Sequence, residues 1–192
     1  MTNNYYQQQA ESFFNNTFDV DMSPLYQAFL ASIQAGGHIV DAGCGSGRDS
    51  RYFADHGFEI TAFDASSTLV ELAKKHTGLE ILLSSFAEFS TNKPADGIWA
   101  CASLLHVPYA ELKNTFKHLA KSLKTGGVFY CSFKYGEGEV EREGRHFTNL
   151  NETLLADVLQ GTNLTVAKYW QTGDQREGRE SEHWLNAILV KS

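Results

Sequence analysis

A short apolar run that leads into three glycines at alternate positions is the most constraining feature of this chain. Residues 39–42 read Ile-Val-Asp-Ala, and Gly43, Gly45 and Gly47 follow before a helical pattern begins. Glycines in such a turn let the backbone reverse sharply and approach a ligand without a clash from Cβ. The next predicted strand ends on Asp64, whose carboxylate can accept both hydroxyls of a ribose. The pattern therefore predicts a nucleoside-containing cofactor at the ends of two neighbouring strands.

Short apolar segments alternate with amphipathic helical patterns from residue 36 onward. Strands are expected at residues 38–42, 58–64, 79–83, 97–102 and 128–133, with helices at residues 46–56, from Ser66 or Ser67 through Ala73, and at residues 109–123. Strands that alternate with helices of about 10–15 residues indicate parallel pairing through right-handed crossovers. The fold class is therefore predicted as α/β, with a doubly wound, mostly parallel sheet covered by helices on both faces.

The two ends of the chain depart from this pattern. Residues 164–170 and 184–190 read as strands, and the polar stretch between them leaves no room for a helix, so an antiparallel hairpin is expected at one edge of the sheet. A helix at residues 151–159 precedes this hairpin. Residues 1–35 form a helical lead-in, with one helix at residues 5–14 and another that begins at Ser23-Pro24. The 192 residues make one domain, in which the lead-in precedes a ligand-binding region at residues 36–192.

Charge and cysteine content argue against several classes of function. The chain has 16 lysines and arginines against 23 aspartates and glutamates, a net charge of −7. Because phosphate neutralisation needs clustered basic residues, this balance argues against nucleic acid and anionic membrane surfaces as partners. The apolar runs are far shorter than the ~18 residues of a membrane span, and three widely spaced cysteines indicate neither a zinc site nor a disulfide framework. We therefore expect a cytoplasmic protein that binds small molecules and no metal.

Two cofactor classes bind at a glycine turn of this kind, and the surrounding residues favour one of them. A dinucleotide site has the pattern G-x-G-x-x-G and places a pyrophosphate at the helix N-terminus. Here Arg48 stands where that pattern has its last glycine, and Asp41 lies two residues before Gly43. A carboxylate at that point opposes a pyrophosphate but suits a ligand that carries an ammonium group and a sulfonium. These residues favour S-adenosylmethionine over NAD.

The segment Asp41-Ala42-Gly43-Cys44-Gly45-Ser46-Gly47 resembles motif I of the class I S-adenosylmethionine-dependent methyltransferases. The resemblance covers roughly residues 36–192 and implies a Rossmann-like methyltransferase fold, whose sheet has seven strands with the last one antiparallel. It also implies a set of cofactor-binding residues in the glycine turn and at the ends of three further strands. That set comprises Asp41, Gly43, Cys44, Gly45, Gly47, Arg48, Asp64, Ala65, Ser66, Phe86, Ala87, Cys101, Ala102 and Ser103.

The resemblance implies a place for each part of this set. Gly43 and Gly45 would pack beneath the methionine part of the cofactor, and Asp41 would lie near its amino group. Asp64 would hold the ribose, and residues 101–103 would lie beside the methyl donor. Residues 65–66 and 86–87 would flank the adenine. The family's usual aspartate is missing from the latter segment, so adenine recognition is expected to rest on backbone groups.

The subgroup and the kind of acceptor follow from shorter motifs. Gly47-Arg48-Asp49-Ser50 resembles small bacterial methyltransferases, including the group linked to tellurite resistance. The chain lacks the Asn/Asp-Pro-Pro-Tyr that methyltransferases of nucleobase amines carry after the fourth strand, and it lacks the paired-glutamate loop of the protein arginine methyltransferases. The resemblance therefore implies a small-molecule acceptor that is methylated by in-line displacement.

Candidate residues for catalysis and acceptor binding follow the fourth and fifth strands, because ligands bind at that edge of open α/β sheets. Because a histidine side chain ordinarily titrates near neutrality, His106 is, with Tyr135 and Glu137, a candidate for the catalytic group. The alternative is that His106 only satisfies backbone groups and that residues 134–139 are a solvated loop. The expected acceptor-binding residues are Tyr5, Tyr26, His106, Lys134, Arg142 and Arg145.

The acceptor-binding set has two further implications. Its arginines suit an anionic acceptor, and its two tyrosines belong to a lead-in that would cap the site as a lid. The sequence does not decide whether Trp184 faces the acceptor or the core of the hairpin.

Two other functions also stay open. A non-catalytic module that binds S-adenosylmethionine, for example for regulation, shares the same motif. An NAD-dependent oxidoreductase shares the fold class but requires a glycine pattern that this chain lacks. Either a monomer or a homodimer is expected.

Overall fold

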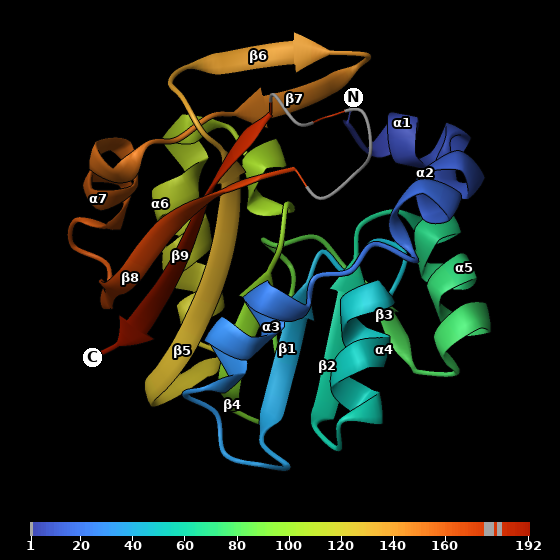
Figure 1. Ribbon diagram of the computed structural model, residues 1–192, viewed down its shortest axis with the longest axis horizontal. Helices are drawn as coiled ribbons and strands as arrows, with labels where there is room; N and C mark the ends of the chain where they lie inside the picture. Colours follow the sequence, from blue (N-terminus) through green and yellow to red (C-terminus); the bar gives the residue numbers. More distant parts are fainter. Residues whose placement is uncertain (1, 175–178, 180–181) are drawn as a thin grey trace.

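The computed structural model describes residues 2–174, 179 and 182–192, with side chains from residue 5 onward (Figure 1). Within these residues, seven strands form one sheet in the order β3-β2-β1-β4-β5-β9-β8. Neighbours from β3 to β5 pair in parallel, whereas β9 is antiparallel to both β5 and β8. The strands are β1 (His38–Ala42), β2 (Glu59–Asp64), β3 (Ile81–Leu83), β4 (Ala95–Ala100), β5 (Leu123–Lys134), β8 (Leu164–Gly173) and β9 (His183–Lys191). The predicted doubly wound sheet and its edge hairpin are confirmed.

Helices cover both faces of the sheet, and the alternation of side chains along β1 explains how they divide. Ile39 packs with α3 and α4 on one face, whereas Val40 packs with α6 on the other, and all of β1 is buried as in a central parallel strand. One face carries α3 (Ser23–Leu30), α4 (Arg48–Asp55) and α5 (Ser67–Thr77), and the other carries α6 (Tyr109–Ala120) and α7 (Glu152–Leu159) (Figure 1). None of the helices described is both long and apolar enough to cross a membrane.

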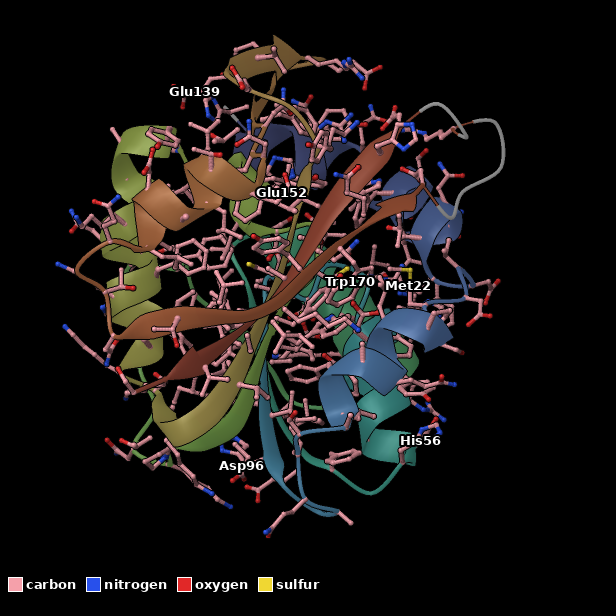
Figure 2. All side chains as sticks on the ribbon, turned by 60° about the vertical axis from the view of Figure 1, so that its left-hand side comes forward. Met22, His56, Asp96, Glu139, Glu152 and Trp170 are labelled. Carbon is pink, nitrogen blue, oxygen red and sulfur yellow. The ribbon has the colours of Figure 1, made fainter. Side chains whose placement is uncertain are left out.

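An aromatic cluster joins distant parts of the chain on the α3 face. Trp99 of β4 and Tyr130 of β5 are fully buried and stacked, with ring centroids 3.9 Å apart. Met22, immediately before α3, and Trp170 of β8, both labelled in Figure 2, pack against this cluster. The cluster therefore holds the end of the lead-in against the centre and the edge of the sheet.

The first part of the lead-in contains two helices where the sequence predicted one, at residues 5–14. α1 (Thr2–Gln8) and α2 (Ala10–Thr17) meet at Gln9, whose φ of −112° and ψ of 16° are not helical. Both helices contact α5. Because the break serves this packing, a helical pattern read along the sequence did not reveal it.

The segment after the fifth strand, expected as a loop from Lys134 to His146, contains a second, two-stranded sheet instead. β6 (Glu139–Arg142) and β7 (Arg145–Thr148) pair antiparallel through a turn in which Glu143 and Gly144 both have positive φ, the conformation of a tight hairpin turn. The loop prediction was wrong because β6 is exposed throughout and shows no apolar alternation. β5 also begins at Leu123 instead of residue 128, since residues 125–127 continue the strand as an irregularity opposite β4.

A buried carboxylate ties the lead-in to the sheet. Asp49, in the first turn of α4, accepts hydrogen bonds from the Tyr26 hydroxyl at 2.5 Å and the Trp99 indole at 2.7 Å. The Arg48 guanidinium donates to both of its oxygens, at 2.6 and 3.1 Å, and also to the carbonyl oxygen of Thr17 at 3.2 Å. Burial by itself would raise the pKa of Asp49, but Arg48 and these donors lower it. One ionised carboxylate therefore joins α2, α3, α4 and β4.

We predict that Asp49→Asn lowers the free energy of unfolding by about 3 kcal/mol, because it leaves the buried Arg48 charge without its partner. Urea unfolding measures this change. Asp55→Asn is the matched control, since Asp55 lies on the same helix but pairs with Arg51 at the surface, where an ion pair contributes less than about 1 kcal/mol. Equal losses in the two variants would contradict the central role of Asp49.

Candidate active site

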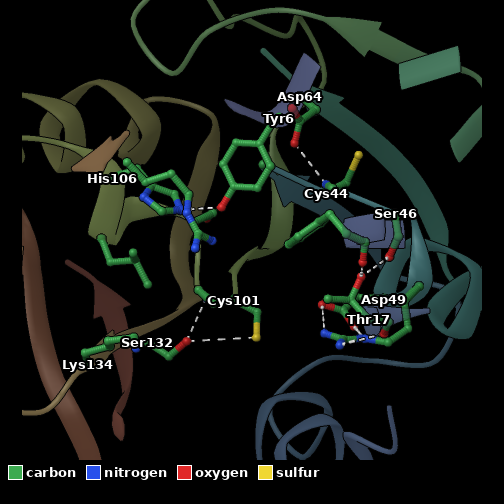
Figure 3. Close-up of a pocket in the computed structure, with 18 of the residues that line it drawn as sticks. Tyr6, Thr17, Cys44, Ser46, Asp49, Asp64, Cys101, His106, Ser132 and Lys134 are labelled. Atoms are coloured by element: carbon green, nitrogen blue, oxygen red, sulfur yellow. Dashed lines mark hydrogen bonds and ion pairs between the residues drawn. The ribbon is translucent and has the colours of Figure 1, made fainter. Parts of the chain in front are cut away.

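A cavity of about 490 Å³ lies at the carboxyl ends of β1, β2, β4 and β5, with the lead-in on one side (Figure 3). Parallel strands bring their carboxyl ends to one edge of the sheet, which is where ligands bind in folds of this kind. Besides the lead-in, the wall has three parts: the glycine turn after β1 together with the end of β2, the loop after β4, and the β6–β7 hairpin together with the end of β5 and the start of β9. The first two parts contain most of the predicted cofactor set.

Two glycines allow the turn after β1 to pass beneath its neighbours. Gly43 has a φ of 76°, and a Cβ built on it would lie 2.7 Å from the Cβ of Ser103. Gly45 has a φ of 54°, and a Cβ there would lie 3.1 Å from the ring of Phe13 on α2. Positive φ and close contact both favour glycine. The glycine pattern in the sequence therefore marks the place where the turn after β1, the loop after β4 and α2 come into close contact.

Asp64, the last residue of β2, lies on the cavity wall beside Ala65 and Phe86. One carboxylate oxygen accepts the N–H of Gly45 and the other accepts the N–H of Ser66, each at 2.9 Å. Burial raises the pKa of Asp64, and these backbone donors act in the opposite direction. Since a carboxylate oxygen has two lone pairs, each oxygen retains one for a ligand hydroxyl.

The loop after β4 forms the second part of the wall. Ala102 has a φ of 49°, which is uncommon for a residue with a side chain, and its N–H donates to Ser132 Oγ at 2.8 Å. Ser103 Oγ donates to the carbonyl oxygen of Ala42 at 2.7 Å, which joins this loop to β1. Burial raises the pKa of Cys101 to about 12, so its thiol is protonated at neutral pH and unsuited to act as a nucleophile.

His106 and Tyr6 meet on the wall, as Figure 3 shows. His106 Nδ1 lies 2.7 Å from the carbonyl oxygen of His146, and because a carbonyl oxygen only accepts, Nδ1 carries the proton. Nε2 therefore accepts the hydroxyl of Tyr6, at 2.8 Å. Burial lowers the pKa of His106 to about 4, so the imidazole is neutral at physiological pH. The sequence offered no signal that would single out Tyr6 among the aromatic residues of the lead-in.

The third part of the wall carries three of the residues predicted to bind the acceptor. Lys134, the last residue of β5, forms an ion pair with Glu182, and Arg142 lies 3.9 Å from the same carboxylate. Arg145 donates to Glu143 Oε2 at 2.7 Å. Lys134, Arg142 and Arg145 all line the cavity, as does Trp184, whose position the sequence left open.

Four described residues of the predicted cofactor set do not line the cavity, namely Asp41, Gly47, Ser66 and Ala87. Asp41 is buried on the α4 side of β1 and accepts the hydroxyl of Ser50 at 2.5 Å. Gly47 packs against α5, and Ser66 caps that helix by accepting the N–H of Leu69. Ala87 is exposed. These four residues shape the turn and its surroundings without facing the cavity.

Tyr135 and Glu137, two of the predicted catalytic residues, also lie away from the cavity. Side chains alternate along a strand, so Tyr135 points away from the side to which Lys134 points. The hydroxyl of Tyr135 lies 3.2 Å from Glu152 on α7, and Glu137 accepts from Asn151 Nδ2 at 2.9 Å. We therefore assign neither residue a catalytic role.

Tyr5 and Tyr26, predicted to bind the acceptor, are likewise absent from the described cavity wall. Tyr26 is buried and donates to Asp49, as part of the network that holds α3. Tyr5 lies against the guanidinium of Arg145, 4.1 Å from its ring centroid. Both tyrosines therefore support residues of the wall without belonging to it.

Comparison with known proteins places the chain in a family. Residues 14–169 match the model of the methyltransferase domain family, and the chain belongs to that family. It is 32% identical over 110 residues to a ubiquinone biosynthesis O-methyltransferase of Coxiella burnetii, covering 50% of this chain and 43% of that protein. It is 32% identical over 93 residues to a malonyl-[acyl-carrier protein] O-methyltransferase of Enterobacter lignolyticus, covering 47% of this chain and 36% of that protein. The chain thus spans less than half the length of these curated relatives.

Solved structures share the fold over nearly the whole chain. The 1,6-didemethyltoxoflavin-N1-methyltransferase of Burkholderia thailandensis matches with a TM-score of 0.79 and 19% identity, covering 98% of this chain and 84% of that one. The N-methyltransferase NodS of Bradyrhizobium japonicum matches with a TM-score of 0.72 and 18% identity, covering 96% and 97%. The predicted Rossmann-like methyltransferase fold and the resemblance to class I methyltransferases are confirmed. The narrower resemblance to the tellurite-resistance group stays a prediction.

We predict that the stability contributed by Asp41 is lost as the pH rises. Burial and the neighbouring Asp49 raise the pKa of Asp41 to about 8, whereas an unfolded aspartate ionises near pH 4. The folded state therefore holds one proton more between roughly pH 4 and pH 8. Asp41→Asn cannot ionise and keeps an acceptor for Ser50. Its stability relative to the wild type is expected to rise with pH in this window, by at most about 1.4 kcal/mol per pH unit.

Urea unfolding of both proteins across this range measures the effect of Asp41. Comparing the two proteins cancels the titration of groups that they share. A stability difference that does not change with pH would contradict the prediction.

Proposed function

We propose that this protein is an S-adenosylmethionine-dependent methyltransferase that acts on a small-molecule acceptor. The observation that carries the proposal is that one cavity brings together the glycine turn after β1, Asp64 at the end of β2 and the loop after β4. Membership of the methyltransferase domain family supports it. The Burkholderia and Bradyrhizobium enzymes of the same fold were crystallised with S-adenosylhomocysteine. The same observations favour this cofactor over NAD.

The residues of the cavity fit S-adenosylmethionine. We assign Asp64 to the ribose hydroxyls, because each of its oxygens retains a lone pair, and we assign Ala65 and Phe86 to the adenine. A Cβ at Gly45 would lie 3.1 Å from the ring of Phe13, so the glycine lets this ring pack directly over the turn. The cavity also extends past the loop after β4 to the β6–β7 hairpin, which leaves a place for the acceptor. When bound, the cofactor supplies a methyl group on a positively charged sulfur for in-line displacement by an acceptor atom.

For such a reaction the protein mainly supplies proximity and alignment. With a pKa of about 4, His106 is a weak base at neutral pH. We therefore propose that His106 Nε2 orients a proton-bearing atom of the acceptor, in the position that the Tyr6 hydroxyl occupies here. When the acceptor takes that position, the Tyr6 hydroxyl would donate its hydrogen bond to the acceptor instead of to His106 Nε2.

A non-catalytic module that binds S-adenosylmethionine remains the second candidate, because it would present the same glycine turn and the same Asp64. The His106–Tyr6 pair and the separate cationic part of the wall favour the enzyme, since a module that only binds the cofactor requires neither. Formation of S-adenosylhomocysteine that depends on an added acceptor distinguishes the two.

We further propose that the protein works in the cytoplasm, as a monomer or a homodimer. Its three cysteines, Cys44, Cys101 and Cys131, are free thiols, which suits a reducing compartment. Light scattering of the purified protein measures the oligomeric state.

We predict that S-adenosylhomocysteine stabilises the protein and that NAD does not. At a concentration about 100-fold above the dissociation constant, a ligand adds about 2.7 kcal/mol to the stability. For a chain of this length, the midpoint of thermal unfolding is expected to rise by roughly 5–10 °C. A shift with NAD alone would overturn the proposed cofactor.

Asp64→Asn provides the residue-level part of the same experiment. The variant is expected to bind S-adenosylhomocysteine about 10- to 100-fold more weakly, because hydrogen bonds to a charged group contribute about 1.5–3 kcal/mol each. Calorimetric titration measures the affinity. Asp55→Asn, a carboxylate on the surface of α4, is the control and should bind as the wild type does.

We infer that residues 1–35 act as a lid over the region at residues 36–192. Phe13 and Tyr6 of the lead-in line the cavity, and Thr17 Oγ1 donates to Ser46 Oγ at 3.3 Å, beside the glycine turn. The lead-in is also hydrogen-bonded to the start of α4, because Arg48 donates to the carbonyl oxygen of Thr17 and Asp49 accepts the hydroxyl of Tyr26. The lead-in therefore contacts the cavity along its length.

We predict that Phe13→Ala speeds the dissociation of S-adenosylhomocysteine roughly tenfold, because it removes an aromatic ring that packs over Gly45. Stopped-flow displacement measures the rate. Asn15→Ala is the control, since Asn15 lies on the exposed side of the same helix. A dissociation rate equal to that of the wild type would contradict the lid.

A further inference from the structure

Among the described residues, the part of the cavity wall formed by the end of β5, the β6–β7 hairpin and the residues between β8 and β9 carries more positive than negative charge. Its cationic residues among those described are Lys134, Arg142, Arg145 and Arg179. Its carboxylates are Glu143, Glu182 and Asp174. This excess stands out in a chain whose net charge is −7. A small excess of positive charge suits a ligand that carries a single negative charge.

Glu182 cannot neutralise all of its partners. It forms an ion pair with Lys134 and lies 3.9 Å from Arg142 and 3.7 Å from Arg179. The single carboxylate of Glu182 thus lies within ion-pair distance of three cationic side chains. The positive charge of this group is therefore only partly compensated by the described residues.

Arg145 is held in place by its surroundings and keeps a donor unused. Its side chain is only 14% exposed, and its guanidinium lies 4.1 Å from the ring centroid of Tyr5 and 5.2 Å from that of Phe147. One terminal nitrogen donates to Glu143. Its Nε is buried and has no hydrogen-bond partner among the described residues. Because buried donors in proteins are almost always paired, an orphaned Nε on a cavity wall points to a ligand acceptor.

The neighbouring residues are apolar or neutral. Phe147 and Trp184 line the same part of the cavity, and His106 beside them is kept neutral by burial. Flat apolar side chains suit the ring or chain of an organic molecule, whereas the fork geometry of a guanidinium suits a carboxylate.

We propose that the methyl acceptor is a small organic acid whose carboxylate binds the guanidinium of Arg145. This inference rests on the proposed methyltransferase function and names the class of its acceptor. The carboxylate serves to anchor the acceptor, and a different atom of the molecule takes the methyl group. That atom forms its bond to the methyl carbon as the carbon–sulfur bond breaks, with the electron pair left on sulfur. The proton that the atom carried is released to water, because His106 with a pKa of about 4 does not retain it at neutral pH.

The carboxylate of the cofactor's own methionine part is the competing partner for Arg145. Two observations favour the acceptor. Arg145 lies on the β6–β7 hairpin, on a different part of the wall from the glycine turn and Asp64. It also packs with Phe147, which contacts His106, the residue that we assign to the acceptor.

The test compares acids with their neutral amides on the protein saturated with S-adenosylhomocysteine. The probes are 4-hydroxybenzoate and 2-aminobenzoate, with 4-hydroxybenzamide and 2-aminobenzamide as matched neutral compounds, and calorimetry measures their binding. The acids are expected to bind at least about tenfold more tightly, a difference of about 1.4 kcal/mol. Arg145→Gln should abolish this preference, and Arg145→Lys should retain part of it, because charge remains while the planar fork is lost.

Two controls separate binding from folding and from general charge. Thermal unfolding of the Arg145 variants checks that they are folded, and their affinity for S-adenosylhomocysteine should equal that of the wild type. Arg51→Gln removes one positive charge from the surface of α4 and should leave the preference for acids intact. In addition, a bound acid should raise the pKa of His106 from about 4, since an anion nearby favours the imidazolium. The pKa of His106 is now lowered mainly by burial, and the positive charges of Arg145 and Lys134 add to this effect.

Four results would overturn the inference. The first would be that the amides bind the wild type as tightly as the acids, and the second that no acid binds at millimolar concentration. The third would be that the preference for acids survives in Arg145→Gln. The fourth would be that this variant loses affinity for S-adenosylhomocysteine but not for 5′-methylthioadenosine, which lacks the carboxylate. That result would mean that Arg145 binds the carboxylate of the cofactor instead of the acceptor. Failure of the wild type to bind S-adenosylhomocysteine would contradict the proposed function itself, and is thereby distinguishable.

Discussion

The ionised carboxylate of Asp49 is the interaction on which the arrangement of this molecule depends. It lies where α4 begins, directly after the glycine turn, and receives donors from α3, α4 and β4. A buried carboxylate without these donors would be strongly disfavoured, so the three elements are held together by the same charge. Arg48 extends the network to Thr17 at the end of α2. The glycine turn, the lead-in and the central sheet thus meet at one buried ion pair.

This arrangement gives the cavity two ends of different character. At one end, Asp64 and the glycine turn present a carboxylate and backbone groups. At the other, Arg145 and its cationic neighbours surround apolar rings. His106 is neutral because it is buried among positive charges, and it receives the hydroxyl of Tyr6 from the lead-in. A cofactor that carries a sulfonium and an acceptor that carries a carboxylate are complementary to these two ends.

Much of the fold and the cofactor side of the site could be predicted from the sequence. The glycine turn, Asp64 and the loop after β4 follow from local patterns, because a sharp turn needs glycine and parallel strands bring their ends to one edge. The β6–β7 hairpin was missed because its exposed strand β6 has no apolar alternation. Tyr6 was predicted only as one of the aromatic residues of the lid, and its pairing with His106 was missed because only the docking of α1 distinguishes it from Tyr5. Lys134 at the end of β5 and Arg142 and Arg145 beyond it were predicted from their place in the chain, not from any contact.

The sequence by itself determined the order of the strands and helices that form the main sheet and its layers, the antiparallel hairpin at the sheet edge and the glycine turn, since these depend on periodicity and on backbone conformations that few residues adopt. Tertiary structure alone decided which side chains at the strand ends face the cavity. Lys134 lies on its wall while the adjacent Tyr135 pairs with Glu152 outside, and Asp41 is buried beside Ser50 instead of facing a ligand. The physical reason is that the direction of a side chain at the end of a strand depends on the elements packed around it, which lie far away in the sequence.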